Sequence, residues 1–190
     1  MLSKTKYPCI DPFRIATHTD ADAITQLINN AYRPKSGNVG WTHEAKLVSG
    51  NRINVTQVKD IISRTDSIIL LGSKDSEIIA CVHVEKTASA SFIGLLAVNA
   101  ALQGGGAGKQ MLAHAEDFAS TRFGSHKFIM AVVSTRHELI AFYIRRGYLE
   151  TGDVMDYPVS ANVGIPKLPG LKIQMLEKCC IRSLEKTVAP

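Results

Sequence analysis

Gln103-Gly104-Gly105-Gly106-Ala107-Gly108-Lys109 holds four glycines in seven residues. Residues 92–98 before it form an apolar run typical of a buried strand, and residues 109–120 after it repeat apolar side chains at helical spacing. A strand that stops at glycines and continues as a helix leaves backbone N–H groups at the positive end of that helix, where anions bind. We therefore predict a phosphate site in this loop.

Two common phosphate-binding loops do not fit the segment. The Walker loop requires a glycine five residues before Gly108 and a Ser or Thr after Lys109, but this chain has Gln103 and Gln110 there. The dinucleotide fingerprint G-x-G-x-x-G fails as well, because its third glycine falls on Lys109 or on the methionine two residues later. A Walker nucleotide site and a dinucleotide site are both excluded.

A third pattern does fit, because Gln103-x-x-Gly106-x-Gly108 resembles the acyl-CoA pyrophosphate loop, Q/R-x-x-G-x-G/A, of the GCN5-related N-acetyltransferase (GNAT) family. A second motif of that family, F/L-Y-x-x-x-G-F/Y, matches the segment from Phe142 to Tyr148. The Asn that usually precedes this motif is replaced by Arg136. Two motifs in the right order identify the chain as a member of the family, with a resemblance over about residues 12–178.

Periodicity and capping residues predict the order strand, two helices, three strands, helix, strand, helix and two strands. Thr19 with Asp22 is expected to cap the first helix, and Asn54 with Gln57 the second. The resemblance implies the GNAT acyl-CoA N-acyltransferase fold, an α/β (α+β) architecture. Its mixed, mostly antiparallel sheet of about seven strands has helices on both faces and a bulge in the fourth strand. We expect one domain over residues 1–190, with residues 33–41 as a surface loop and 179–190 as a C-terminal tail.

Composition agrees with a soluble protein. Hydrophobic residues make up 45% of the chain, enough for a sizeable core. The net charge of +5 is spread without a basic block, which argues against nucleic acid as a partner and suits a polyanionic cosubstrate. The four cysteines lack a C-x-x-C spacing, so we predict no metal. Neither a membrane span nor a signal segment is expected, and the predicted location is cytoplasmic.

Acetyl-CoA is the cosubstrate that the resemblance implies. In this family, the pantetheine arm lies between two splayed strands and bonds to main-chain groups of one of them, and the pyrophosphate lies on the glycine loop. Two other roles are open for Arg136: its guanidinium contacts a CoA phosphate or a substrate carboxylate, or it forms an ion pair with Glu138 or another surface carboxylate. The cofactor-binding residues implied in this way are Leu96, Ala97, Val98, Gln103, Gly104, Gly105, Gly106, Ala107, Gly108, Lys109, Arg136 and Tyr143.

Acetyl transfer to an amine needs a deprotonated amine and a proton for the departing thiolate. The resemblance assigns the general acid to Tyr143, whose alternative is an ordinary core position. The usual base position in the fourth strand holds no titratable side chain here. The candidate bases are therefore His83 and Glu85 on the neighbouring strand and His43 and Glu44 after the loop, each of which could also be structural, and a water chain is a further route.

The sequence thus predicts an N-acetyltransferase that transfers the acetyl group of acetyl-CoA to a primary amine of a small molecule, peptide or protein by direct attack through a ternary complex. The alternative is a catalytically weak CoA-binding regulatory module of the same fold. Residues 36–44 and 153–169 are expected to line the acceptor site. A monomer and a homodimer both remain open, as do the acceptor, the base and the role of Arg136.

Overall fold

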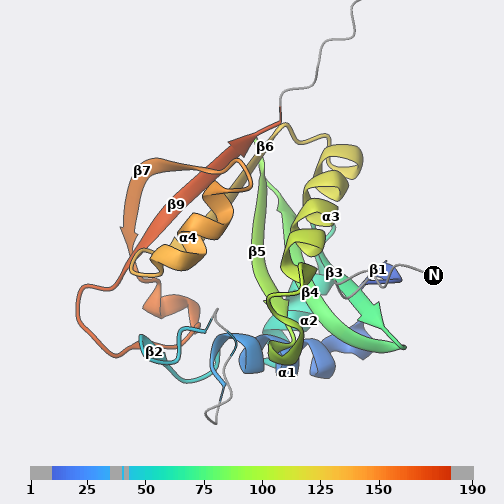
Figure 1. The fold of residues 1–190 in the computed structure, drawn as a ribbon, viewed down its shortest axis with the longest axis horizontal. Helices are drawn as coiled ribbons and strands as arrows, with labels where there is room; N and C mark the ends of the chain where they lie inside the picture. Colours follow the sequence, from blue (N-terminus) through green and yellow to red (C-terminus); the bar gives the residue numbers. More distant parts are fainter. Residues whose placement is uncertain (1–9, 35–39, 41–42, 181–190) are drawn as a thin grey trace, which may run out of the picture.

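The chain folds around a seven-stranded sheet with the strand order β1-β3-β4-β5-β6-β9-β7 (Figure 1). The computed structural model describes residues 10–34, 40 and 43–180; most of the predicted loop at 33–41 and residues 181–190 of the predicted tail lie outside these ranges. The strands are β1 (Phe13–Ile15), β3 (Ser67–Lys74), β4 (Glu77–Lys86), β5 (Ser91–Val98), β6 (Lys127–Val133), β7 (Leu149–Asp156) and β9 (Lys172–Cys179).

Helices cover both faces of the sheet, as predicted. The α-helices are α1 (Ala21–Tyr32), α2 (Val55–Ser63), α3 (Ala107–Arg122) and α4 (His137–Ile144). Apolar residues of α1 and α2 share one core cluster with β3, β4 and β5, whereas α3 and α4 contribute to the larger cluster on the opposite face. All neighbouring strands are antiparallel except β5 and β6, which confirms the predicted mixed, mostly antiparallel sheet.

The parallel pair β5 and β6 separates soon after it forms. Only Ser91 with Phe128 and Phe92 with Ile129 are in register, and beyond them the two strands splay apart, as Figure 1 shows. In the same region β5 carries a bulge against β4, where Leu95 adopts a left-handed φ of 49°. A bulge bends its strand and re-aims the side chains that follow. The bulge and the splay that the family resemblance implied are therefore both present.

The first helix begins differently from the prediction. A short 3-10 turn, η1 (His18–Asp20), precedes α1, and the carboxylate that accepts hydrogen bonds at this start belongs to Asp20 rather than Asp22. Asp20 Oδ2 accepts from the Thr17 backbone N–H at 2.8 Å, and both carboxylate oxygens accept from Arg14 at 2.7 Å. The expected Thr19 cap is wrong because the capping box joins Thr17 and Asp20, two residues earlier, where the arginine on β1 holds the acidic side chain.

Other local predictions differ less. Asn54 and Gln57 form the predicted capping box at the start of α2. The hairpin between β3 and β4 is tighter than expected, since only Asp75 and Ser76 lie between the strands and both have positive φ. The sequence did not indicate a small second sheet of β2 (Val48–Ser49) and β8 (Ile165–Pro166), because two-residue strands carry no periodic signal.

Candidate active site

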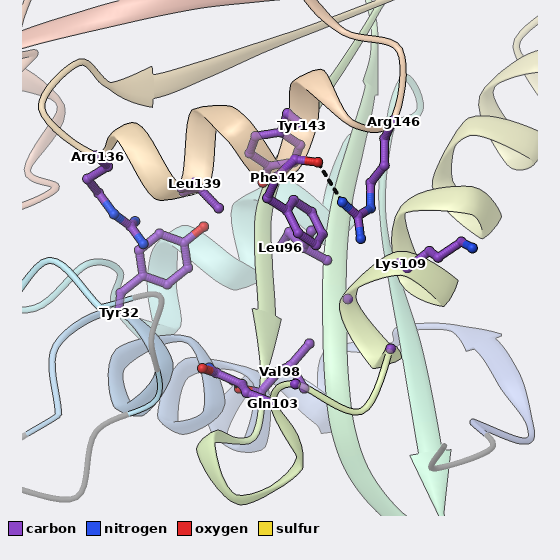
Figure 2. Close-up of a pocket in the computed structure, with 13 residues that line it drawn as sticks. Tyr32, Leu96, Val98, Gln103, Lys109, Arg136, Leu139, Phe142, Tyr143 and Arg146 are labelled. Atoms are coloured by element: carbon purple, nitrogen blue, oxygen red, sulfur yellow. Dashed lines mark hydrogen bonds between the residues drawn. The ribbon is translucent and has the colours of Figure 1, made fainter. Parts of the chain in front are cut away.

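A cavity of about 350 Å³ lies between the end of β5, the glycine loop and α4, and we call it the glycine-loop cavity (Figure 2). The splay of β5 from β6 opens the sheet here, and α4 supplies the facing wall. Its lining residues are Tyr32, Leu96, Val98, Gln103, Gly104, Gly106, Gly108, Lys109, Arg136, Leu139, Phe142, Tyr143 and Arg146.

Most of the predicted cofactor-binding residues meet in this cavity. Three do not line it. Ala97 is 2% exposed and packs in the core cluster on the α1 and α2 face, because successive strand residues point to opposite faces. Ala107 is buried in the core under α3, and Gly105 is also absent from the lining. Any contact of these three with a cofactor would involve the backbone.

The glycine loop turns directly into α3. Gly106 precedes the first helical residue in the left-handed conformation, with φ of 85°, and Gly104 has φ of 80°. Side chains with a Cβ rarely adopt this conformation, so glycines allow the tight entry into the helix. Lys109 in the first turn of α3 and Arg146 on the facing segment both add positive charge to the cavity. The cavity end at the loop is therefore suited to an anion.

Gln103 fixes the loop to the end of β5. Its amide Nε2 donates to the Val98 carbonyl at 3.1 Å. On its other side the chain passes close by at Gly40, where a Cβ would lie only 2.0 Å from Gln103 Oε1. The side chain thus fills the space between the loop and the segment after α1, and its role in the structure is to position the backbone.

Phe142 and Arg146 form a second wall that the sequence did not indicate. The Arg146 guanidinium carbon lies 3.4 Å from the centroid of the Phe142 ring, and Nη1 donates to the Phe142 carbonyl. Phe142 lies in the last turn of α4 and Arg146 lies just beyond the end of the helix, both within the Phe142 to Tyr148 motif. The motif signalled the helix, whereas the direction of these side chains depends on how α4 crosses the splayed strands.

A second cavity of about 430 Å³ opens beside the first, and we call it the α2 cavity. It is lined by α2, by the inner parts of β4, β5 and β6, and by the segment after β7. Glu44, Met155, Tyr157 and Val163 line it, so parts of the two predicted acceptor walls lie here; residues 36–39 and 41–42 of the first wall lie outside the described residues. Both cavities share Tyr32, Leu96, Arg136, Leu139 and Tyr143, and these five side chains define a junction.

Tyr143 lies at this junction and is 7% exposed. Its ring packs edge to face against Phe142 and Tyr148, with centroid distances of 5.2 and 5.8 Å. Burial raises the pKa of the Tyr143 phenol, and the nearby Tyr32 hydroxyl raises it further. The phenol is therefore fully protonated at neutral pH and has a proton to donate.

Tyr32 brings a second phenol to the junction, which the sequence indicated only as the end of the first helix. Burial raises the pKa of Tyr32 as well. The guanidinium of Arg52 lies over its ring, 5.5 Å from the centroid, on the side of the α2 cavity. A tyrosine at a helix terminus carries no motif, so only the three-dimensional arrangement assigns it to the site.

The candidate bases occupy different places. His83 lines the α2 cavity, with Nε2 at 2.7 Å from Ser67 Oγ, and burial lowers the pKa of its imidazole to about 4. Glu44 also lines this cavity but accepts a hydrogen bond from Arg33 at 3.1 Å. Glu85 is in the lining of neither cavity and pairs with Arg64 at 2.8 Å. His43 is partly buried, which lowers the pKa of its imidazole.

Arg136 is the most unusual side chain of the junction. It is 4% exposed, yet its Nε and Nη2 atoms have no hydrogen-bond partner among the described residues. The alternative of an ion pair with Glu138 is not formed between the residues that the structure describes. A buried guanidinium without a partner is costly, because its N–H groups have been removed from water.

The described part of the chain contains neither a cluster of metal-binding side chains nor a helix able to span a membrane. No group of three or more His, Cys, Asp or Glu side chains is placed to hold a metal ion within residues 10–34, 40 and 43–180. Within the same ranges, every helix is too short or too polar to cross a bilayer.

Comparison with known proteins identifies the family. The family model described as "Acetyltransferase (GNAT) family" matches residues 24–148, about two thirds of the chain. The chain therefore belongs to the GNAT acetyltransferase family. No relative is found among curated protein sequences.

Solved structures show the same fold. An N-acetyltransferase from Staphylococcus aureus Mu50 is similar over 90% of this chain and 98% of that one, with a TM-score of 0.68 and 14% identity. The ribosomal-protein-S18-alanine N-acetyltransferase from Escherichia coli is similar over 92% and 97%, with a TM-score of 0.67 and 14% identity. A GNAT family acetyltransferase from Elizabethkingia anophelis with acetyl-CoA bound is similar over 65% and 82%, with a TM-score of 0.56 and 19% identity.

Proposed function

We propose that this chain is an N-acetyltransferase that transfers the acetyl group of acetyl-CoA to a primary amine by direct attack in a ternary complex. The observation that carries the proposal is the meeting of two cavities at Tyr143. One cavity has the glycine loop, three cations and an apolar wall, as a phosphate-bearing thioester requires. The other gives a separate partner access to the same point. The proposal takes residues 1–190 as one domain.

The residues of the glycine-loop cavity fit acetyl-CoA. We assign the pyrophosphate to the backbone of residues 104–109 with Lys109 and Arg146, and the pantetheine arm to the strand residues 96–98. Phe142 and Leu139 supply apolar contacts to the pantetheine arm. When bound, acetyl-CoA supplies an activated acetyl group, and the apolar lining keeps water from hydrolysing it.

Tyr143 acts as the general acid in this mechanism. As the amine nitrogen bonds to the acetyl carbon and the carbon–sulfur bond breaks, the Tyr143 hydroxyl donates its proton to the departing sulfur. A base accepts the proton that the amine nitrogen loses, and that proton returns to the phenolate to complete the cycle. A phenol whose pKa is raised by burial retains its proton until the thiolate forms.

The predicted bases differ in whether they line the α2 cavity. His83 and Glu44 line the α2 cavity, whereas Glu85 lies outside its lining. His83 is neutral at pH 7 and can accept a proton, although a pKa of about 4 makes it a weak base. The test is the pH dependence of kcat/KM in His83→Gln, Glu44→Gln and Glu85→Gln. Replacement of the base removes the acidic limb of the profile, whereas the other two variants keep it.

The runner-up function, a catalytically weak CoA-binding regulatory module, draws support from the same two side chains. His83 is a weak base and Glu44 is held in an ion pair with Arg33, so neither of the predicted bases that line the α2 cavity is both strong and free. Binding of acetyl-CoA without turnover would be the behaviour of such a module.

The test is release of free CoA thiol from acetyl-CoA across a broad panel of primary amines, including small molecules, peptides and proteins. Thiol release that depends on an amine supports the enzyme. Tight CoA binding with no release from any amine supports the regulatory module. A cytoplasmic location, and the choice between monomer and homodimer, stay predictions.

A further inference from the structure

Arg136 presents a buried positive charge with unused hydrogen-bonding capacity. The side chain is 4% exposed, and Nε and Nη2 are fully buried without a partner in the described part of the chain. A guanidinium has five N–H donors in a planar fork, and the three on Nε and Nη2 are left unmet here in a low-dielectric interior, which is unfavourable. The site is therefore electrostatically incomplete without an anion.

The protein's own carboxylates do not complete it. Glu44, the one buried acid of the α2 cavity, is paired with Arg33, and the two charges offset each other. Apart from Arg136, the remaining charged residues in that lining are Asp60 and Arg52, whose formal charges are opposite. One positive charge is left over, that of Arg136, so the α2 cavity attracts a negatively charged partner.

The phosphates of acetyl-CoA are poorly placed to supply this anion. Figure 2 shows Arg136 at one end of the row of lining side chains and Lys109 with the glycine loop at the other, with Leu139 and Phe142 between them. Lys109 and Arg146 line only the glycine-loop cavity, whereas Arg136 lines both cavities. The anion for Arg136 therefore enters from the α2 cavity.

The shape and the position of the Arg136 guanidinium indicate which kind of anion it binds. A guanidinium pairs best with a planar two-oxygen anion, to which it donates two parallel hydrogen bonds, and a carboxylate has this shape. Arg136 shares the junction with Tyr143, where the proposed reaction occurs. A carboxylate bound by Arg136 thus lies only a few bonds from the reacting amine.

We propose that Arg136 binds the carboxylate of the acceptor, and that the acceptor is a small amino acid in which amine and carboxylate are separated by a few bonds. This inference rests on the proposed acetyltransferase function. It disfavours a protein lysine or a peptide N-terminus, because neither carries a free carboxylate close to its amine.

The test compares amino acids with matched amines that lack the carboxylate. We would measure kcat/KM from thiol release for the common amino acids, their amides and their decarboxylated amines, expressed per concentration of neutral amine to remove differences in amine pKa. Wild-type protein should favour the carboxylate members by about 10- to 100-fold, the range for a charge-assisted pair.

Two variants and one control assign the effect to Arg136. In Arg136→Gln and Arg136→Met the preference for the carboxylate members should fall to about one. Arg146→Gln, a second arginine beside the cavity, should raise the KM for acetyl-CoA but keep the carboxylate preference. Unchanged CoA affinity in the Arg136 variants shows that they remain folded.

Three results would overturn the inference. If each amino acid and its matched amine are acetylated at equal rates, Arg136 does not bind an acceptor carboxylate, although the acetyltransferase function stands. A uniform rate loss for all acceptors in Arg136→Gln means that the guanidinium acts on the thioester. If no amine is acetylated, binding of N-acetyl amino acids and of their amides in the presence of CoA decides: equal affinity overturns the inference, and a preference lost in Arg136→Gln supports it.

Discussion

Arg33 and Glu44 form an ion pair with Nη2 and Oε1 3.1 Å apart, and their side chains are only 6% and 4% exposed. The same guanidinium also donates to the Tyr157 hydroxyl and to the carbonyls of Val163 and Gly50. The residue after α1 is thereby joined to the segment after β7, which forms one wall of the α2 cavity. The shape of the α2 cavity therefore depends on the ion pair of Arg33 with Glu44, although both residues are far in sequence from the segment after β7.

Replacement of Arg33 by Met should destabilise the protein by about 3–5 kcal/mol, because the buried Glu44 carboxylate loses its compensating charge. The double variant Arg33→Met with Glu44→Leu buries no charge and should recover most of this loss. The free energy of unfolding in urea measures both. Equal losses in the single and double variants would show that the arginine stabilises mainly through Val163 and Gly50.

Replacement of Tyr143 by Phe should lower kcat by about 10²- to 10⁴-fold while CoA affinity changes by less than about threefold, since only proton donation is removed. Tyr148→Phe is the matched control. Its ring lies 5.8 Å from Tyr143, but its hydroxyl donates to Glu116 and the residue lines neither cavity. It should cost about 1 kcal/mol of stability and leave kcat unchanged. Equal rates for wild type and Tyr143→Phe would remove the acid assignment.

Replacement of Gly106 by Glu should weaken acetyl-CoA binding by at least about tenfold, because it puts a negative charge where the pyrophosphate is assigned and repels it. The glycine has φ of 85°, so any side chain is also strained there. Gly152→Glu controls for that strain, because Gly152 has the same φ and lies on β7 in open space. Calorimetric titration with CoA compares the two. Retained affinity in Gly106→Glu would mean that the phosphates bind elsewhere.

Local patterns accounted for most of the fold. Apolar periodicity, the Asn54 cap and the glycine loop are encoded within a few residues of one another, and the order of helices and strands followed from them. The start of α1 was missed because the capping carboxylate is selected by Arg14, a neighbour on another element. The ion pair of Glu44 was missed for the same reason, because its partner Arg33 lies on another segment and cannot be recognised from the residues next to Glu44.

The site was predictable only where a motif marks it. The loop and Tyr143 were indicated by their spacing, but Tyr32, Leu139 and Arg146 became lining residues through the splay of β5 from β6 and the crossing of α4 above it. Arg136 was recognised by its departure from the family pattern. Its unmet hydrogen bonds, which carry the inference about the acceptor, are a property of the packed structure alone.

The buried His83 should make the protein less stable in mild acid. Burial, with help from Arg64 and Arg52, lowers the pKa of the folded imidazole from 6.5 to about 4. Above pH 6.5 the side chain is neutral in both the folded and unfolded states and stability is at its full value. As the pH falls from 6.5 towards 4, the unfolded state takes up a proton that the folded state does not, so stability is lost.

At pH 4.5 this loss amounts to about 2.5 kcal/mol relative to neutral pH. His83→Gln keeps a hydrogen-bonding partner for Ser67 but cannot titrate. Urea unfolding of both proteins at pH 7 and pH 4.5 separates the effect of His83 on the free energy of unfolding from that of the carboxylates, which titrate in both proteins. The wild type should lose about 2.5 kcal/mol more than the variant between the two pH values. Parallel losses would show that the folded imidazole accepts its proton as readily as the unfolded one.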